Sequence, residues 1–150
     1  MLALGKTYNL TTELAIFKKQ YRMKLHPDAS NAYSIQSYSA EGVVVNGKLQ
    51  AGPMKLCAIQ GPQTWSADVF EDLTQDAFDE LLAYKPELVI FGSGERLRFP
   101  KPEWQVGLMQ RRVGLETMDT QAACRTYNIL AGEGRKVAAA LLIEASASKN

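Results

Sequence analysis

The spacing of apolar residues divides the chain into a β-rich first part and a second part in which helices and strands alternate. Between residues 33 and 59, short apolar runs are interrupted at Gly42, Asn46-Gly47 and Gly52-Pro53. Asn-Gly is the strongest short hairpin signal, because both central positions of a type I′ turn need a positive φ. We therefore expect a hairpin at Asn46-Gly47 and strands at 34–38, 43–45, 48–51 and 54–59.

An amphipathic helix is expected over residues 74–85. Phe78, Leu81 and Leu82 recur at i, i+3 and i+4, which places them on one helical face. Thr74 is a good N-cap, and Pro86 ends the helix. The next apolar run, 88–91, shows no alternation, so it is predicted to be a parallel strand that is buried on both faces.

The order of helix and strand then repeats. Pro102 suits the first turn of a second helix, which Gly114 is expected to end. A strand over 115–118 leads into a helix that Thr120 is expected to cap. Residues 137–143 fit either a helix, because of their alanines and leucines, or a strand that returns to the sheet. This order predicts a doubly wound α/β unit after the strand-rich region.

Composition and charge exclude several classes of protein. The chain has 150 residues, of which 46% are hydrophobic and 22% charged, as in an ordinary soluble domain. A net charge of +1 argues against bulk electrostatic attraction to nucleic acid. No apolar run approaches the roughly 18 residues of a membrane span. Cys57 and Cys124 are too few for a disulfide framework, and both are expected to remain thiols, with Cys57 in the core.

The ends of the chain are expected to lie outside the folded domain. Residues 1–26 carry five lysines and arginines against one glutamate, so this basic leader has a charge of +4 and the rest −3. We expect residues 1–22 to be a mobile N-terminal extension, 23–143 a single domain and 144–150 a tail. A targeting segment, or an upstream start with Met23 as the natural first residue, are the alternatives for 1–22. His26 lies in loop-like sequence and is expected to be solvated, so no metal site is expected.

A candidate site is predicted where two expected strands end. In open parallel sheets, ligands bind beyond the carboxyl ends of the strands. The strand over 88–91 runs into Gly-Ser-Gly, and the strand over 115–118 runs into Asp-Thr. We expect the loops after these strands to face each other, because right-handed crossovers point both strand ends the same way. The candidate residues are Gly92, Ser93, Gly94, Arg96, Arg98, Asp119, Thr120, Cys124, Arg125 and Tyr127.

These residues offer the chemistry of a small anion site. The glycines allow a ligand or another backbone to come close. The helix that begins at Thr120 presents free N–H groups, which suit a carboxylate or phosphate together with Arg96, Arg98 or Arg125. Cys124, so near a helix N-terminus, would have a lowered pKa if it were exposed.

The alternative is an architectural clasp without a ligand. Asp119 would then pair with Arg96 or Arg98, loop carbonyls would hold Arg125, and Cys124 would lie in the core. Named catalytic motifs are incomplete. The dinucleotide fingerprint lacks its third glycine, the P-loop lacks Gly-Lys-Ser/Thr, and the esterase elbow lacks both its spacing and a downstream histidine.

Two segments together resemble a known family. Residues 88–100, Leu-Val-Ile-Phe-Gly-Ser-Gly-Glu-Arg-Leu-Arg-Phe-Pro, and 118–128, Met-Asp-Thr-Gln-Ala-Ala-Cys-Arg-Thr-Tyr-Asn, resemble the two signatures of the Mth-like domain family. The resemblance implies a three-layer α/β fold with a mixed central sheet, mostly parallel strands and an antiparallel last strand. It thereby implies that 137–143 is a strand. The N-terminal β-hairpin region comes from the residue pattern.

The resemblance also guides the functional expectation, since the family includes a mitochondrial assembly factor for respiratory complex I. It implies a non-enzymatic binding or assembly factor with a protein partner, and it supplies no catalytic residues. The alternative is a small-molecule-binding protein or enzyme with the anion site described above. No cofactor and no nucleic acid are expected. The expected compartment is the cytoplasm of a bacterium, or the mitochondrial matrix if the source is eukaryotic.

Overall fold

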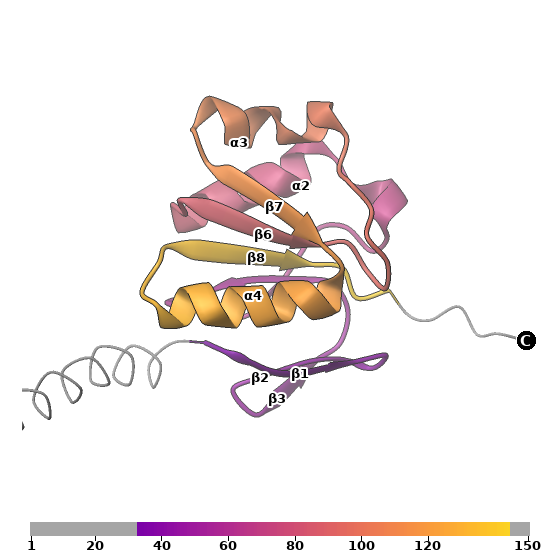
Figure 1. Ribbon diagram of the computed structural model, residues 1–150. Coiled ribbons are helices and arrows are strands. Elements are labelled where there is room, and N and C mark those ends of the chain that lie inside the picture. Colours follow the sequence, from indigo (N-terminus) through magenta and orange to yellow (C-terminus); the bar gives the residue numbers. More distant parts are fainter. Residues whose placement is uncertain (1–32, 145–150) are drawn as a thin grey trace, which may run out of the picture.

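The computed structural model describes residues 33–144 (Figure 1). The predictions for residues 1–22, for His26 and for the tail from 145 onward lie outside the described residues. None of the helices in the described part of the chain is long and apolar enough to cross a membrane.

The first part of the described chain forms a small antiparallel sheet. Its strands are β1 (Ile35–Ser39), β2 (Gly42–Val45) and β3 (Lys48–Gln50), in the order β1-β2-β3. The hairpin between β2 and β3 turns at Asn46 and Gly47, whose φ angles of 47° and 85° confirm the predicted turn. The N-terminal β-hairpin region is therefore as predicted.

The central sheet has five strands in the order β5-β4-β8-β6-β7. They are β4 (Met54–Cys57), β5 (Gln63–Thr64), β6 (Leu88–Gly92), β7 (Gly114–Met118) and β8 (Val137–Leu141). β6 is parallel to both β7 and β8, whereas β4 is antiparallel to β5 and β8. The mixed sheet is confirmed. The last strand, β8, is antiparallel to β4 as expected, but it is parallel to β6. A crossover helix returns the chain in its original direction, so β8 joins β6 in parallel.

Helices cover both faces of this sheet. The predicted helix over 74–85 is an α-helix, α2 (Gln75–Asp79), followed by a 3-10 helix (Glu80–Tyr84). Thr74 caps it as predicted, since its Oγ1 accepts a hydrogen bond from the Ala77 N–H at 3.2 Å. The second helix has the reverse order, with a 3-10 turn (Pro102–Gln105) followed by α3 (Val106–Gln110). A further 3-10 turn (Phe70–Asp72) precedes α2, and α4 (Thr120–Gly132) is the longest described helix.

One predicted helix end is wrong. Gly114 was expected to end the second helix, yet it is the first residue of β7. Arg112 instead occupies the left-handed region, with φ of 57°. Gly114 belongs to the strand because of tertiary pairing, since its N–H donates to the Glu87 carbonyl at 3.1 Å and so starts β7.

The layers follow from the two crossovers. The chain passes from β6 through α3 to β7 at one edge, and then back through α4 to β8 on the other side of β6. Right-handed crossovers in opposite directions place their helices on opposite faces. Figure 1 shows α2 and α3 on one face and α4 with the β1–β3 sheet on the other. The alternation of buried side chains agrees, because Ile90 packs toward α4 whereas Val89 and Phe91 pack toward α2 and α3.

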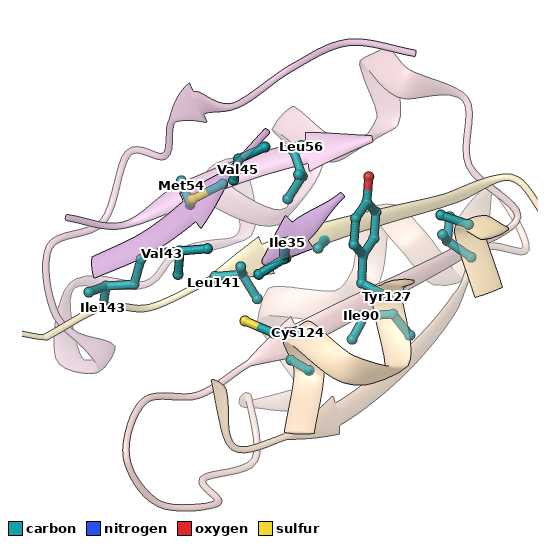
Figure 2. Close-up of a cluster of buried hydrophobic side chains, with 14 residues drawn as sticks. Ile35, Val43, Val45, Met54, Leu56, Ile90, Cys124, Tyr127, Leu141 and Ile143 are labelled. Carbon is teal, nitrogen blue, oxygen red and sulfur yellow. The ribbon is translucent and has the colours of Figure 1, made fainter. Parts of the chain in front are cut away.

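Trp65 and both cysteines are buried, and Cys57 lies in the core as predicted. Trp65 is 1% exposed and its indole N–H donates to the Ala77 carbonyl at 2.8 Å, so it closes the core against α2. Cys57 and Cys124 are both buried free thiols. Figure 2 shows Cys124 and Tyr127 projecting from α4 into the core that contains Ile35 and Leu141.

Candidate functional site

The two predicted loops lie side by side at the carboxyl ends of β6 and β7. The Ser93 N–H donates to the Met118 carbonyl at 2.9 Å, which extends the β6–β7 pairing by one residue. Gly94 and Thr120 then exchange two hydrogen bonds, from the Gly94 N–H to Thr120 Oγ1 and from the Thr120 N–H to the Gly94 carbonyl, each 2.8 Å long. The expected convergence is therefore present, and its first contacts are within the chain.

Thr120 bridges three segments and does not cap the helix. The N-cap is Asp119, whose Oδ1 accepts from the Ala122 N–H at 2.9 Å. Thr120 is the first residue of α4 and is fully buried. Its hydroxyl accepts from Gly94 and donates to the Leu142 carbonyl at 2.7 Å. The predicted cap is wrong by one residue, because the Thr120 side chain is drawn into these contacts with segments distant in sequence.

The two glycines make room for the protein itself. A Cβ added to Gly92 would lie 3.0 Å from the Cα of Thr120. Gly94 has a φ of 104°, and its added Cβ would lie 2.6 Å from the guanidinium of Arg98. Both glycines are thus required by close packing of backbone and side chain.

Arg98 holds the first loop in place. Its Nε and Nη2 donate to the Ser93 carbonyl at 3.0 and 2.6 Å, and Nη2 also pairs with Glu144. The guanidinium carbon lies 4.7 Å from the centre of the Phe70 ring, a cation–π distance. The Phe70 N–H donates to the second oxygen of Glu144 at 3.0 Å.

A clasp is present, but it is not the predicted one. Asp119 was expected to pair with Arg96 or Arg98, and loop carbonyls were expected to hold Arg125. Instead Glu144 pairs with the Arg98 guanidinium, and Arg125 is exposed. Glu144 was assigned to the tail, and no local signal links it to a loop 46 residues away. Ser93 completes the clasp, since its Oγ accepts from the Arg98 N–H at 2.9 Å and donates to the Arg96 carbonyl at 2.8 Å.

The remaining arginines do not converge on the loops. The side chains of Arg96 and Arg125 are exposed, and neither forms an ion pair within the described residues. A cleft of about 250 Å³ opens between the loops, and it is lined by Tyr38, Gly94, Glu95, Asp119 and Gln121. This lining holds two carboxylates and no cation.

The start of α4 is also filled by the chain's own acceptors. The Thr120 N–H donates to the Gly94 carbonyl and the Ala122 N–H to the Asp119 carboxylate, so an incoming anion would compete with both. Together with burial, the nearby Glu95 raises the pKa of the Tyr38 hydroxyl. The anion site at this edge stays a prediction, and its electrostatic surroundings are unfavourable to a negative ligand.

Cys124 is not an activated thiol. It is 5% exposed, and burial raises its pKa to about 12, while the neighbouring Arg125 offsets only part of that effect. A lowered pKa was predicted for an exposed thiol at a helix N-terminus, and the burial removes the condition. The thiol is instead part of the core.

Tyr127 and Asn128 attach the small sheet to α4. The Tyr127 hydroxyl donates to the Tyr33 carbonyl at 2.7 Å, and burial raises its pKa. The Asn128 amide accepts from the Ile35 N–H at 2.8 Å and donates to the Ile35 carbonyl at 2.5 Å, which imitates a strand partner for β1. The sequence reasoning did not select Asn128. The available signal was a polar side chain that could make two backbone bonds next to a buried helical position.

Comparisons with known proteins agree with the fold. The family model described as "Protein of unknown function (DUF498/DUF598)" matches residues 35–142. A protein of Bos taurus named NADH dehydrogenase [ubiquinone] 1 alpha subcomplex assembly factor 3 is 35% identical over 120 residues, covering 79% of this chain and 65% of its own length. This chain thus spans about two thirds of the length of that curated relative.

Solved structures give the same result. A crystal structure of a Bordetella parapertussis protein has a TM-score of 0.71 and 32% identity, covering 74% of this chain and 95% of its own. A solution structure of a Bordetella pertussis protein described as a Mth938-like domain has a TM-score of 0.67 and 28% identity, covering 75% of this chain and 86% of its own. The resemblance found in the two sequence segments is confirmed.

Proposed function

This chain belongs to the DUF498/DUF598 family, and from that premise we propose that it is a protein-binding assembly factor for a respiratory NADH dehydrogenase. Relatives that carry an assembly-factor name share about a third of their aligned residues with it. The observation that carries the proposal is that side chains of the candidate site are occupied by contacts within the protein. Four chemically capable side chains of the signature segments are committed to internal contacts or to the core, namely Ser93, Arg98, Thr120 and Cys124.

Those contacts support a role in presenting a surface. Arg98 is held by the Ser93 carbonyl, by Glu144 and by the Phe70 ring, so the loop around it has a fixed backbone. Its two sequence neighbours point outward, with Leu97 50% and Phe99 69% exposed. Large apolar side chains on a rigid backbone bind with a small loss of conformational entropy, so this pair suits the centre of a protein interface.

The test is affinity purification from cells that express the tagged full chain. We expect NADH dehydrogenase subunits or another assembly protein to copurify with the wild type. The Leu97→Ser/Phe99→Ser variant should lose that partner. Ile129→Ser is the matched control, because Ile129 is also an exposed apolar side chain, at 61%. It lies about 13 Å along the helix axis from Thr120, the first residue of α4.

Two results would contradict the proposal. One is the absence of any specific partner, combined with normal NADH dehydrogenase content in a deletion strain. The other is equal partner loss in the Ile129→Ser control, which would remove the loop from the interface. Urea denaturation of each purified variant separates lost binding from lost folding.

The compartment, whether bacterial cytoplasm or mitochondrial matrix, stays a prediction.

A further inference from the structure

A larger cleft lies at the opposite end of the central sheet. It is formed where β4 ends, β6 and β8 begin, and α4 ends, and its volume is about 570 Å³. Pockets that bind small molecules have volumes of roughly 300–1,000 Å³. The candidate loops after β6 and β7 contribute nothing to this cleft, so it is a separate feature of the fold.

The lining combines apolar walls with positive charge. Apolar surface comes from Cys57, Ala58, Ile59, Pro86, Ala131 and Val137. The charged lining residues are Lys85, Arg135 and Lys136, and no carboxylate is among them. The smaller cleft at the other end has the reverse character, with Glu95 and Asp119 and no cation. Anions are therefore favoured at the end of the sheet opposite to the one that the sequence predicted.

Two of the three cations are available to a ligand. Arg135 pairs with Glu87 at 2.9 Å, and both side chains are about half exposed. Lys85 and Lys136 form no ion pair within 4.0 Å among residues 33–144. Lys85 also has a φ of 52°, in the left-handed region where glycine or asparagine is favoured. This conformation ends the 3-10 helix (Glu80–Tyr84), since the Lys85 N–H donates to the Leu82 carbonyl at 3.0 Å.

We propose that this cleft binds a small amphiphilic carboxylate, a molecule with an apolar chain and one acidic head group. The chain would lie against Ile59, Ala131 and Val137, and the carboxylate would meet the ammonium groups of Lys85 and Lys136. Ile59 is 87% exposed at the cleft, so an apolar ligand would remove its side chain from water. This inference does not depend on the assembly role, because it concerns other residues and another class of ligand.

The experiment is an NMR titration of the ¹⁵N-labelled full chain with sodium decanoate below its micelle concentration. Decylammonium chloride is the matched probe with the same chain and opposite charge. We expect decanoate to shift the amide signals of Ile59, Lys85 and Lys136. The amides of Gly94 and Glu95 at the other end of the sheet serve as an internal reference. Decanoate should bind at least about ten-fold more tightly than decylammonium, since two lysines attract one head group and repel the other.

Variants test the role of charge. Lys85→Asn keeps a residue that tolerates the left-handed conformation, and Lys136→Gln keeps most of the side-chain length. Together they should weaken decanoate binding about ten-fold, because each partly exposed ion pair contributes a few-fold. Lys48→Gln/Lys101→Gln removes the same charge from exposed positions away from the cleft and should change the affinity less than about two-fold.

Several outcomes would overturn the proposal. These are shifts confined to Gly94 and Glu95, equal binding of decylammonium, or equal weakening by the two double variants. Binding of an acidic apolar peptide at the cleft without decanoate binding would also overturn it, since the occupant would then be a protein. Unchanged amide spectra of the free variants establish that each one is folded.

Discussion

The bridge made by Thr120 allows the sharpest test of the structure. Thr120→Val keeps the shape of the side chain but removes its hydroxyl, and it leaves the Gly94 N–H and the Leu142 carbonyl without this partner. Each buried polar group that loses its hydrogen bond costs about 1–3 kcal/mol. Since Thr120 is fully buried, we expect a loss of about 3 kcal/mol in the free energy of unfolding.

Thr120→Ser is the matched comparison. Serine retains the hydroxyl and both hydrogen bonds but loses one buried methyl group, which costs about 1 kcal/mol. Urea denaturation followed by tryptophan fluorescence measures both variants, and an unchanged m value shows that the midpoint reports stability. If Thr120→Val were as stable as Thr120→Ser, or more so, the Thr120 hydroxyl would not stabilise the contact between the two loops, and this reasoning would be refuted.

Two further predictions concern the same helix. Stability should fall as the pH rises from about 9 toward 12, because unfolding releases the Cys124 thiol to ionise at its ordinary pKa of 9.0 while the folded protein keeps it protonated to about 12. In thermal melts between pH 8 and 11, Cys124→Ala should reduce the fall of the melting temperature with pH. An equal fall in the variant and the wild type would show that the thiol is exposed. Asn128→Asp removes the amide donor and sets a carboxylate against the Ile35 carbonyl, so amide hydrogen exchange in β1 should accelerate at least about ten-fold with α4 unchanged. Protection of β1 equal to wild type would contradict the strand-like role of Asn128.

The candidate site shows how far sequence reasoning could go. The loops after β6 and β7 were placed together correctly, because strand direction and crossover handedness are general rules of α/β sheets. Their chemistry was only partly foreseen. A clasp between Asp119 and Arg96 or Arg98 was one of the two stated alternatives, but Arg98 pairs with Glu144, and Asp119 caps α4. Neither assignment could be read from residue type, since both acids are suitable partners for arginine.

The direction of the last strand illustrates the same limit. Residues 137–143 were ambiguous by periodicity, since fully buried strands and helices both give continuous apolar runs. The observed β8 is buried along its whole length between β4 and β6. Its two neighbours run in opposite directions, so both parallel and antiparallel pairing occur on one strand.

What the sequence determined by itself is the local structure: the Asn46-Gly47 hairpin, the Thr74 cap, the order of strands and helices, and the edge where the two loops end. The hairpin, the cap and each single element depend on residues close together in the chain, and the shared edge follows from the general handedness of crossovers. The tertiary structure alone decided that Thr120 contacts Leu142, that Asn128 pairs with β1, and that Cys124 is buried. Such contacts join segments far apart in the chain, and their free energy exists only once the layers have packed. The positive cleft between Lys85 and Lys136 likewise arises only when the ends of three strands meet.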